Sequence, residues 1–264
     1  MVIGIGLSTA EEISLIAKRA GHEIMKVYKT GFTAVLKTDH TPVTKADQIA
    51  EEIIIHAIRE GITSKWPIVA EESISKGKIP KIEKTPFWLV DPLDGTKEFI
   101  KRNNEFTVNI ALIDNEEPIL GIVHAPAKNI SYIGFKDGVF LQKGDEDGVA
   151  ISVRTPPKNG LTAVLSNSHA NAKSVDYLKN YHLAKTTNTG SSLKFCMIAE
   201  GSADIYPRFG PTMEWDTAAG HAILKFAGGN VLTTAGTPLK YGKNNFKNPY
   251  FIALSPDCEQ FINK

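Results

Sequence analysis

The sequence has 264 residues, enough for one large domain or for two modest ones that share a cleft. Its apolar content of 42% and charged content of 22% are typical of a soluble globular protein, and a net charge of +1 argues against a general binder of polyanions such as nucleic acids. An anionic ligand would therefore have to be bound by a local group of charges.

The cysteines and the apolar segments indicate an intracellular protein. Cys196 and Cys258 are far apart and form neither a CxxC motif nor a disulfide framework, which suits a reducing compartment. The apolar residues 1–7 are too short for a signal peptide and lack a basic start. No apolar run approaches the length of a membrane span. We expect a cytoplasmic protein without an integral membrane segment.

Two helices are predicted near the start of the chain. Ser8 and Glu11 have the spacing of a capping box, and apolar residues then recur at helical spacing as far as Val27, so that a first helix should end near Gly31. A second run with helical spacing continues as far as Ile58.

Thr44 and Asp47 stand where the second helix should begin. Thr44 is a natural N-cap, and Asp47 falls in the first turn, where a carboxylate suits the helix dipole. Local evidence alone therefore favours a purely structural role for Asp47.

Acids follow two short apolar runs. Residues 67–70 predict a strand that leads into two adjacent acids beginning with Glu71. Residues 87–90 predict a buried strand that stops at Asp91, because Pro92 has no amide hydrogen to give to a sheet. We expect Glu71 to fold back against the Asp91 turn.

The segment from Asp91 to Thr96 reads D-P-L-D-G-T. Asp91 and Asp94 stand on a tight turn that Gly95 permits, with the Leu93 carbonyl between them. These are the hard oxygen donors that a small divalent cation such as Mg²⁺ prefers. Taken alone, the pattern is more often explained by aspartates that cap a turn or a helix.

From Phe106 onward the pattern predicts an antiparallel meander. Apolar runs at 108–113, 119–124, 130–135 and 139–142 alternate with turns rich in Asp, Asn and Gly.

Residues 155–160, T-P-P-K-N-G, are the best candidate linker. They divide the chain into an N-terminal part, residues 1–154, and a C-terminal part, residues 155–264. In the second part, predicted strands (161–165, 203–206, 231–232 and 250–254) alternate with predicted helices (172–181, 191–201 and 217–227). This alternation favours a mixed or parallel sheet covered by helices.

Four motifs, in order, resemble those of the inositol monophosphatase superfamily of lithium-sensitive, Mg²⁺-dependent phosphatases. They are residues 91–96 (its D-P-[IL]-D-G-[ST] signature), residues 215–220 (W-D-T-A-A-G, its second signature), the acidic pair Glu71-Glu72 and the early motif Thr44-x-x-Asp47. The resemblance covers nearly the whole chain. It implies an α/β fold in α-β-α-β-α layers, with two helices on an antiparallel sheet in the N-terminal part.

Within that superfamily the sequence most resembles 3′(2′),5′-bisphosphate nucleotidases of the bacterial CysQ type. Residues 95–100 (G-T-K-E-F-I), 190–196 (G-S-S-L-K-F-C) and 206–212 (Y-P-R-F-G-P-T) carry this resemblance, whereas inositol monophosphatases usually have T-x-N-F-x-H in place of residues 96–101. The resemblance implies an enzyme that hydrolyses the 3′-phosphate of 3′-phosphoadenosine 5′-phosphate to give AMP and phosphate, and that also accepts 3′-phosphoadenylyl sulfate.

The resemblance assigns two or three Mg²⁺ ions to the acids. Glu71, Asp91 and the Leu93 carbonyl would hold one ion. Asp91, Asp94 and Asp216 would hold a second, so that Asp91 bridges the pair.

The same resemblance implies the catalytic and substrate-binding residues. The Thr96 hydroxyl would accept a hydrogen bond from the attacking water while donating to Asp47, which makes these two residues the catalytic pair. The substrate-binding residues would be Gly95, Thr96, His169, Ser191, Lys194, Arg208 and Asp216, with Ser191, Lys194 and Arg208 near the ribose and the 5′-phosphate and His169 near the adenine or a phosphate.

Two alternatives remain open from the sequence. One is an inositol monophosphatase or another sugar-phosphate phosphatase of the same superfamily. The other is a non-catalytic sensor of nucleotide or metal, although the catalytic pair is present in the chain. In every case the expected partner is a small molecule rather than a nucleic acid, and the expected state is a monomer or a homodimer.

Overall fold

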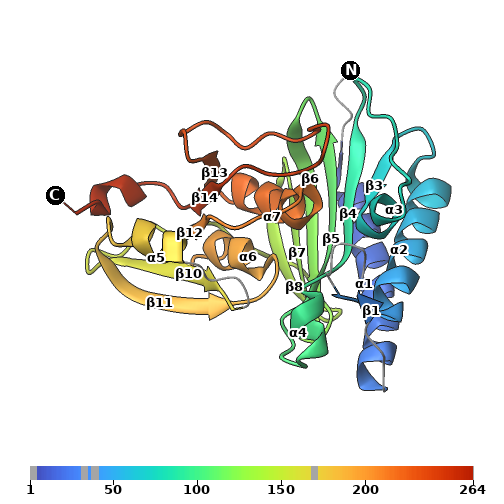
Figure 1. Cartoon of the computed structure of the whole chain (residues 1–264), viewed down its shortest axis with the longest axis horizontal. Coiled ribbons are helices and arrows are strands. Elements are labelled where there is room, and N and C mark those ends of the chain that lie inside the picture. Colours follow the sequence, from blue (N-terminus) through green and yellow to red (C-terminus); the bar gives the residue numbers. More distant parts are fainter. Residues whose placement is uncertain (1–4, 31–34, 37–41, 168–171, 264) are drawn as a thin grey trace.

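Within residues 5–30, 35–36, 42–167 and 172–263, which the computed structural model describes, the chain forms five alternating layers of helix and sheet (Figure 1). Helices α1 and α2 cover one face of a large sheet, α6 and α7 lie between it and a second sheet, and α5 packs on the far side. This order confirms the predicted α-β-α-β-α layers. The helices are α1 (Leu7–Lys29), α2 (Lys45–Ala57), the π-helical turn η1 (Ile58–Ile62), α3 (Glu71–Ser75), α4 (Thr96–Ile100), α5 (Ala172–Leu178), α6 (Leu193–Ala199), α7 (Glu214–Phe226) and the 3₁₀ helix η2 (Cys258–Phe261).

The larger sheet has seven strands in the order β3-β4-β5-β6-β7-β8-β9. All neighbours are antiparallel except β3 and β4, which are parallel. The predicted meander is confirmed as β5 to β8. The strands are β3 (Ile68–Ala70), β4 (Phe87–Asp94), β5 (Thr107–Asp114), β6 (Glu117–Ala125), β7 (Ile130–Phe135), β8 (Gly138–Lys143) and β9 (Val149–Ala150).

The second sheet is mixed, as predicted, with the strand order β11-β10-β12-β14-β13. Strands β11, β10 and β12 run parallel, whereas β14 pairs antiparallel with both β12 and β13. Its strands are β10 (Leu161–Ser166), β11 (Leu183–Thr189), β12 (Ile205–Arg208), β13 (Asn230–Thr233) and β14 (Phe251–Leu254), and a separate small pair joins β1 (Val35–Leu36) to β2 (Pro42–Val43).

Helix α7 lies unusually close to the larger sheet. A Cβ atom at Gly121 of β6 would lie 2.3 Å from the carbonyl oxygen of Ala219, and one at Gly134 of β7 would lie 2.7 Å from the Cα of Ile223. Two strand glycines thus leave room for the helix backbone. The apolar core on this side of the sheet includes Trp215, also from α7.

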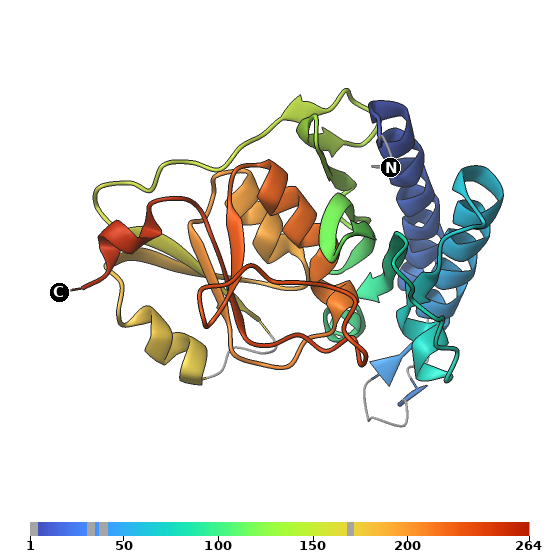
Figure 2. The same cartoon turned by 90° about the horizontal axis from the view of Figure 1, so that it is seen from above.

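The connection from β9 to β10 runs along one side of the molecule from the larger sheet to the smaller one (Figure 2). It is held on the way, since the amide of Val153 donates to the carbonyl of Ala227 at 3.0 Å. The predicted division of the chain at residue 155 stays a prediction. One apolar core contains residues from both parts, among them Leu89 and Phe195, so the two parts pack against each other.

Predicted boundaries of three helices are wrong. Helix α5 ends at Leu178, three residues before its predicted end. Ser8 does not cap α1: the helix begins one residue earlier, and its N-cap is Gly6, in an extended conformation and without a side-chain hydrogen bond. Helix α1 ends at Lys29, and Gly31 lies outside the described residues. Helix α7 begins at Glu214, three residues before the predicted start.

The β4 strand does not stop at Pro92. Asp91 pairs with Asn109 and Asp94 pairs with Thr107, so three residue steps on β4 oppose two on β5. The extra residue forms a bulge, and a proline is tolerated there because a bulge leaves one residue outside the hydrogen-bond ladder.

In the part of the chain that the structure describes, no helix is both long enough and apolar enough to cross a membrane.

Two buried histidines predict a loss of stability in mild acid. Burial lowers the pKa of His124 to about 4 and that of His221 to about 3. Above pH 6.5 both histidines are neutral in the folded and the unfolded chain. Below pH 6.5 the histidines of the unfolded chain bind protons, whereas those of the folded chain stay neutral. The free energy of unfolding therefore falls as the pH falls towards the folded pKa values.

A His124→Gln variant tests this pH dependence. Each pKa unit of difference corresponds to roughly 1.4 kcal/mol, so the stability lost by His124→Gln at pH 7 should shrink by about 2 kcal/mol at pH 5. Urea unfolding of both proteins at the two pH values measures this difference. A loss of equal size at both pH values would contradict the prediction.

Candidate active site

The two neighbouring parallel strands β3 and β4 bring the first acids together. Ala70 pairs with Val90, so Glu71, the next residue after β3, lies beside Asp91 of β4. The predicted return of Glu71 to the Asp91 turn is therefore observed. Asp91 is almost completely buried, at 1% exposure.

The bulge of β4 shapes the turn that follows. The amide of Leu93 donates to Oδ1 of Asp91 at 3.1 Å, which closes the turn back on the strand. Gly95 has a φ of 89°, and a Cβ atom there would lie 3.0 Å from the carbonyl oxygen of Glu105, so both its conformation and its close contact favour glycine. Thr96 then begins α4.

Asp47 has a structural role and also faces Thr96. Its Oδ2 accepts hydrogen bonds from the amide of Thr44 at 2.7 Å and from the Thr44 hydroxyl at 2.8 Å, while the Thr44 hydroxyl accepts one from Ala46, so the predicted helix cap is confirmed. Its Oδ1 accepts a hydrogen bond from the Thr96 hydroxyl at 3.2 Å. The hydroxyl also lies 3.2 Å from the carbonyl oxygen of Leu93.

The second half of the chain contributes Asp216, from the first turn of α7. Its Oδ2 accepts a hydrogen bond from the amide of Met213 at 2.7 Å. Carboxylate oxygens of Glu71, Asp91 and Asp216 all lie within 4.8 Å of one another. Residues 145 positions apart in sequence thus form one acidic cluster.

Asp94 lies beside this cluster and is held by two residues that sequence reasoning missed. The Ser192 hydroxyl lies 3.0 Å from Oδ2 of Asp94 and 2.9 Å from the carbonyl oxygen of Asp216, and it accepts a hydrogen bond from Asn109 at 2.8 Å. Ser192 therefore links β4, β5 and α7. The sequence signal for Ser192 is its place in the G-S-S-L-K stretch, directly after the predicted Ser191.

Burial and neighbouring negative charges raise the pKa values of the acids at this site. Burial raises the pKa of Asp216 well above its usual range, and the neighbouring Asp94 and Glu71 raise it further. Burial also raises the pKa of Asp94, although Lys194 partly offsets this. A bound cation would relieve both effects, because it favours the charged form of each carboxylate.

The donor set fits a hard divalent cation. The groups that converge are carboxylates, with neither a thiol nor an imidazole among the cluster members, and oxygen donors of this kind suit Mg²⁺, Ca²⁺ or Mn²⁺.

A cavity of about 430 Å³ opens in front of the acids and contains most of the predicted substrate-binding residues. Among the residues that line it are Glu71, Asp91, Leu93, Asp94, Gly95, Thr96, Ser166, Ser191, Lys194, Tyr206, Arg208 and Asp216. Asp47 lies just outside the lining and is reached through Thr96, and His169 lies outside the described residues.

Basic and polar groups line the cavity together with the acids. Burial lowers the pKa of Lys194 to about 8, while the Asp94 carboxylate raises it. Among the described residues, Oγ of Ser191 and Nε of Arg208 are buried without a hydrogen-bond partner. Ser191 also has a φ of 49°, an uncommon backbone conformation that is often found at functional sites. Unpaired buried donors in a cavity indicate that a ligand completes their hydrogen bonds.

Known proteins share this chain's sequence and fold over most of its length. The family model described as the inositol monophosphatase family matches residues 8–250. The 3′(2′),5′-bisphosphate nucleotidase CysQ of Escherichia coli K12 is 44% identical over 244 residues, which cover 91% of this chain and 97% of that protein.

Two solved structures extend the comparison. The crystal structure of CysQ from Bacteroides thetaiotaomicron has a TM-score of 0.79 and 35% identity, and the match covers 95% of this chain and 98% of that one. An inositol monophosphatase (IMPase) from Thermotoga maritima has a TM-score of 0.76 and 25% identity, with 94% and 92% coverage. This chain therefore belongs to the inositol monophosphatase family.

Proposed function

We propose that this protein is a Mg²⁺-dependent 3′(2′),5′-bisphosphate nucleotidase that hydrolyses 3′-phosphoadenosine 5′-phosphate to AMP and phosphate and also accepts 3′-phosphoadenylyl sulfate. One observation carries the proposal: a single cavity is lined by the acidic cluster and by Lys194 and Arg208. A substrate with two phosphates needs a site that cleaves one and a site that holds the other. The similarity to CysQ nucleotidases over nearly the full chain supports this choice.

The acidic cluster would hold the metal. Glu71, Asp91 and Asp216 supply the converging carboxylates, and the Leu93 carbonyl and Asp94 lie beside them. When bound, divalent cations neutralise the charge of a phosphate monoester and lower the pKa of a bound water.

Thr96 and Asp47 would orient the attacking water. With its hydrogen donated to Asp47, the Thr96 hydroxyl presents its lone pairs and can accept a hydrogen bond from the water. Asp47 is fixed by Thr44 on its other oxygen, so the pair is held before substrate arrives.

Lys194, Arg208 and Ser191 would bind the second phosphate and the ribose. With a pKa of about 8, Lys194 is mostly protonated at pH 7, and a bound phosphate would favour the protonated form further. The unpartnered Nε of Arg208 and Oγ of Ser191 offer donors that phosphate oxygens can satisfy. The proposal also places the enzyme in the cytoplasm, as a monomer or homodimer.

Phosphate release from two substrates tests the proposal. We expect rapid release from 3′-phosphoadenosine 5′-phosphate with Mg²⁺, none with EDTA, and slow release from inositol 1-phosphate. Arg208→Ala should weaken the nucleotide reaction at least tenfold more than the inositol reaction, because only the nucleotide has a second phosphate. A preference for inositol 1-phosphate would overturn the substrate, and equal losses in both reactions would remove Arg208 from the second-phosphate site.

A further inference from the structure

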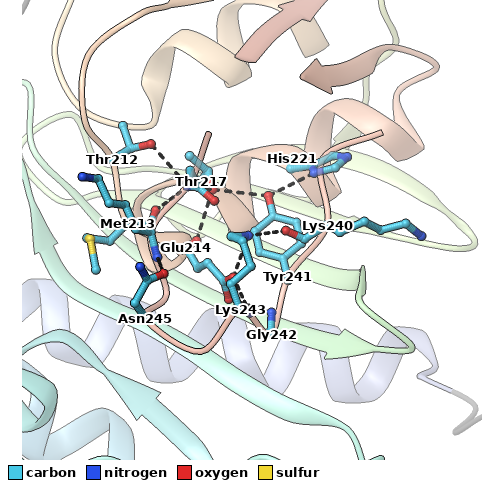
Figure 3. Close-up of polar contacts among 12 residues, drawn as sticks. Thr212, Met213, Glu214, Thr217, His221, Lys240, Tyr241, Gly242, Lys243 and Asn245 are labelled. Carbon is cyan, nitrogen blue, oxygen red and sulfur yellow. Dashed lines mark hydrogen bonds and ion pairs between the residues drawn. The ribbon is translucent and has the colours of Figure 1, made fainter. Parts of the chain in front are cut away.

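The first turn of α7, which carries Asp216, is held by the segment 240–248 between β13 and β14 (Figure 3). This segment runs alongside the residues that lead into the helix, and Met213 forms an isolated antiparallel bridge with Lys247. The amide of Glu214, the first residue of α7, donates to the carbonyl of Phe246 at 2.7 Å.

The Glu214 side chain binds the N-terminal end of the same 240–248 segment. Its carboxylate is completely buried and accepts hydrogen bonds from the amides of Gly242 at 2.8 Å and Lys243 at 2.9 Å. The ammonium group of Lys243 adds an ion pair at 2.6 Å. These contacts compensate the charge of a carboxylate that is removed from water.

Asn248 holds the residue to which Asp216 is bonded. Its Nδ2 donates to the carbonyl of Met213 at 2.7 Å and lies 3.0 Å from the hydroxyl of Thr217. A carbonyl can only accept, which fixes the orientation of the Asn248 amide. The amide of the same Met213 donates to Oδ2 of Asp216. Asn248 and Asp216 thus bind the two polar groups of one backbone residue.

We propose that Glu214 and Asn248 are positioning residues that set where the carboxylate of Asp216 points and thereby set the affinity of the acidic cluster for its cation. The inference rests on the proposed function in one respect, namely that Asp216 is a metal ligand. Losing a direct hydrogen-bond partner of a metal ligand typically lowers metal affinity or activity by about 10-fold to 100-fold. Glu214 and Asn248 act through the backbone that bonds to Asp216, so we expect an effect near the lower end of this range.

Direct metal titration of a Glu214→Gln variant tests the inference. Glutamine keeps the shape of the side chain but loses the charge that binds Lys243 and one of the two acceptor atoms that the amides need. Calorimetric titration of Mn²⁺ into metal-stripped protein, without substrate, should show binding about tenfold weaker than in the wild type. Thermal unfolding of the same metal-stripped samples reports how much of the effect is simple destabilisation.

Glu117→Gln is the matched control. Glu117 pairs with Lys225 and Lys240, each at 2.9 Å, so the variant makes the same chemical change and also removes an ion pair of the 240–248 segment. It is half exposed and bonds to the last turn of α7 rather than the first. We expect its Mn²⁺ affinity to stay within about twofold of the wild type, as is usual for a surface ion pair.

Two outcomes would overturn the inference, and they are distinguishable. If Glu214→Gln unfolds at a lower temperature but binds Mn²⁺ as tightly as the wild type, its role is structural only. If the wild type itself binds no Mn²⁺, the metal site of the proposed function is wrong, and the inference fails with it. Should Glu214→Gln fail to fold, Asn248→Ala leaves Glu214 and its contacts in place, removes the side-chain contacts of Asn248 to Met213, Thr212 and Thr217, and is expected to weaken Mn²⁺ binding in the same direction.

Discussion

Replacing Asp216 with asparagine is expected to lower kcat by at least about a thousandfold and, at the same time, to stabilise the metal-free protein. The activity should fall because the cluster loses one of its three converging carboxylates. The stability should rise because the buried Asp216 lies close to Asp94 and Glu71, which carry the same negative charge and repel it. Asparagine keeps an oxygen that can accept the hydrogen bond from Met213.

Steady-state kinetics in saturating Mg²⁺ measures the loss of kcat, and thermal unfolding at pH 8, in EDTA and in saturating Mg²⁺, measures the change in stability. In EDTA the variant should unfold at a higher temperature than the wild type; with Mg²⁺ the order should reverse, because only the wild type gains the full free energy of metal binding. Asp137→Asn, which removes an exposed acid from the turn between β7 and β8, serves as the control and should change neither quantity. A variant that is less stable than the wild type in EDTA would contradict the idea that the acids repel one another.

The parts of the site that the sequence predicted are those encoded within a few residues. The turn after Asp94 depends on Gly95, whose φ is 89°, and the place of Asp47 depends on the helix cap three residues before it. Glu71 could be placed because it directly follows a short strand close to the next one in sequence. In each case local chemistry determines the conformation, and the sheet then only has to bring neighbouring segments together.

The missed features depend on contacts between distant segments. Asn109 reaches Ser192 across 83 residues, and the Glu214 carboxylate selects backbone amides 28 and 29 residues away, which no local pattern specifies. Strand β11 was missed because most of its residues are exposed or only half-buried, so it lacks an apolar signal. The continuation of β4 through Pro92 was missed because a bulge depends on the register of the partner strand.

Asp47→Asn should lower kcat by roughly 10²-fold to 10⁴-fold while leaving KM and metal affinity close to those of the wild type. The reason lies in the two different sides of this carboxylate. The side that faces Thr44 meets two donors, a backbone amide and a hydroxyl, so an asparagine must place its oxygen there. Its NH₂ group then faces Thr96 and donates to the hydroxyl, which can no longer use the same lone pair to accept a hydrogen bond from the water.

Three further variants separate the orientation of the water from the mere presence of a charge at Asp47. Thr96→Ser keeps the hydroxyl and should retain most of the activity, whereas Thr96→Val removes it and should lose about as much as Asp47→Asn. Since the two residues act as one unit, the double variant Asp47→Asn/Thr96→Val should be no slower than either single variant within about threefold. Steady-state kinetics of the wild type, the three single variants and the double variant at saturating Mg²⁺ measures this. Losses that multiply in the double variant would mean that Asp47 and Thr96 act independently, and that the hydrogen bond between them does not orient the water.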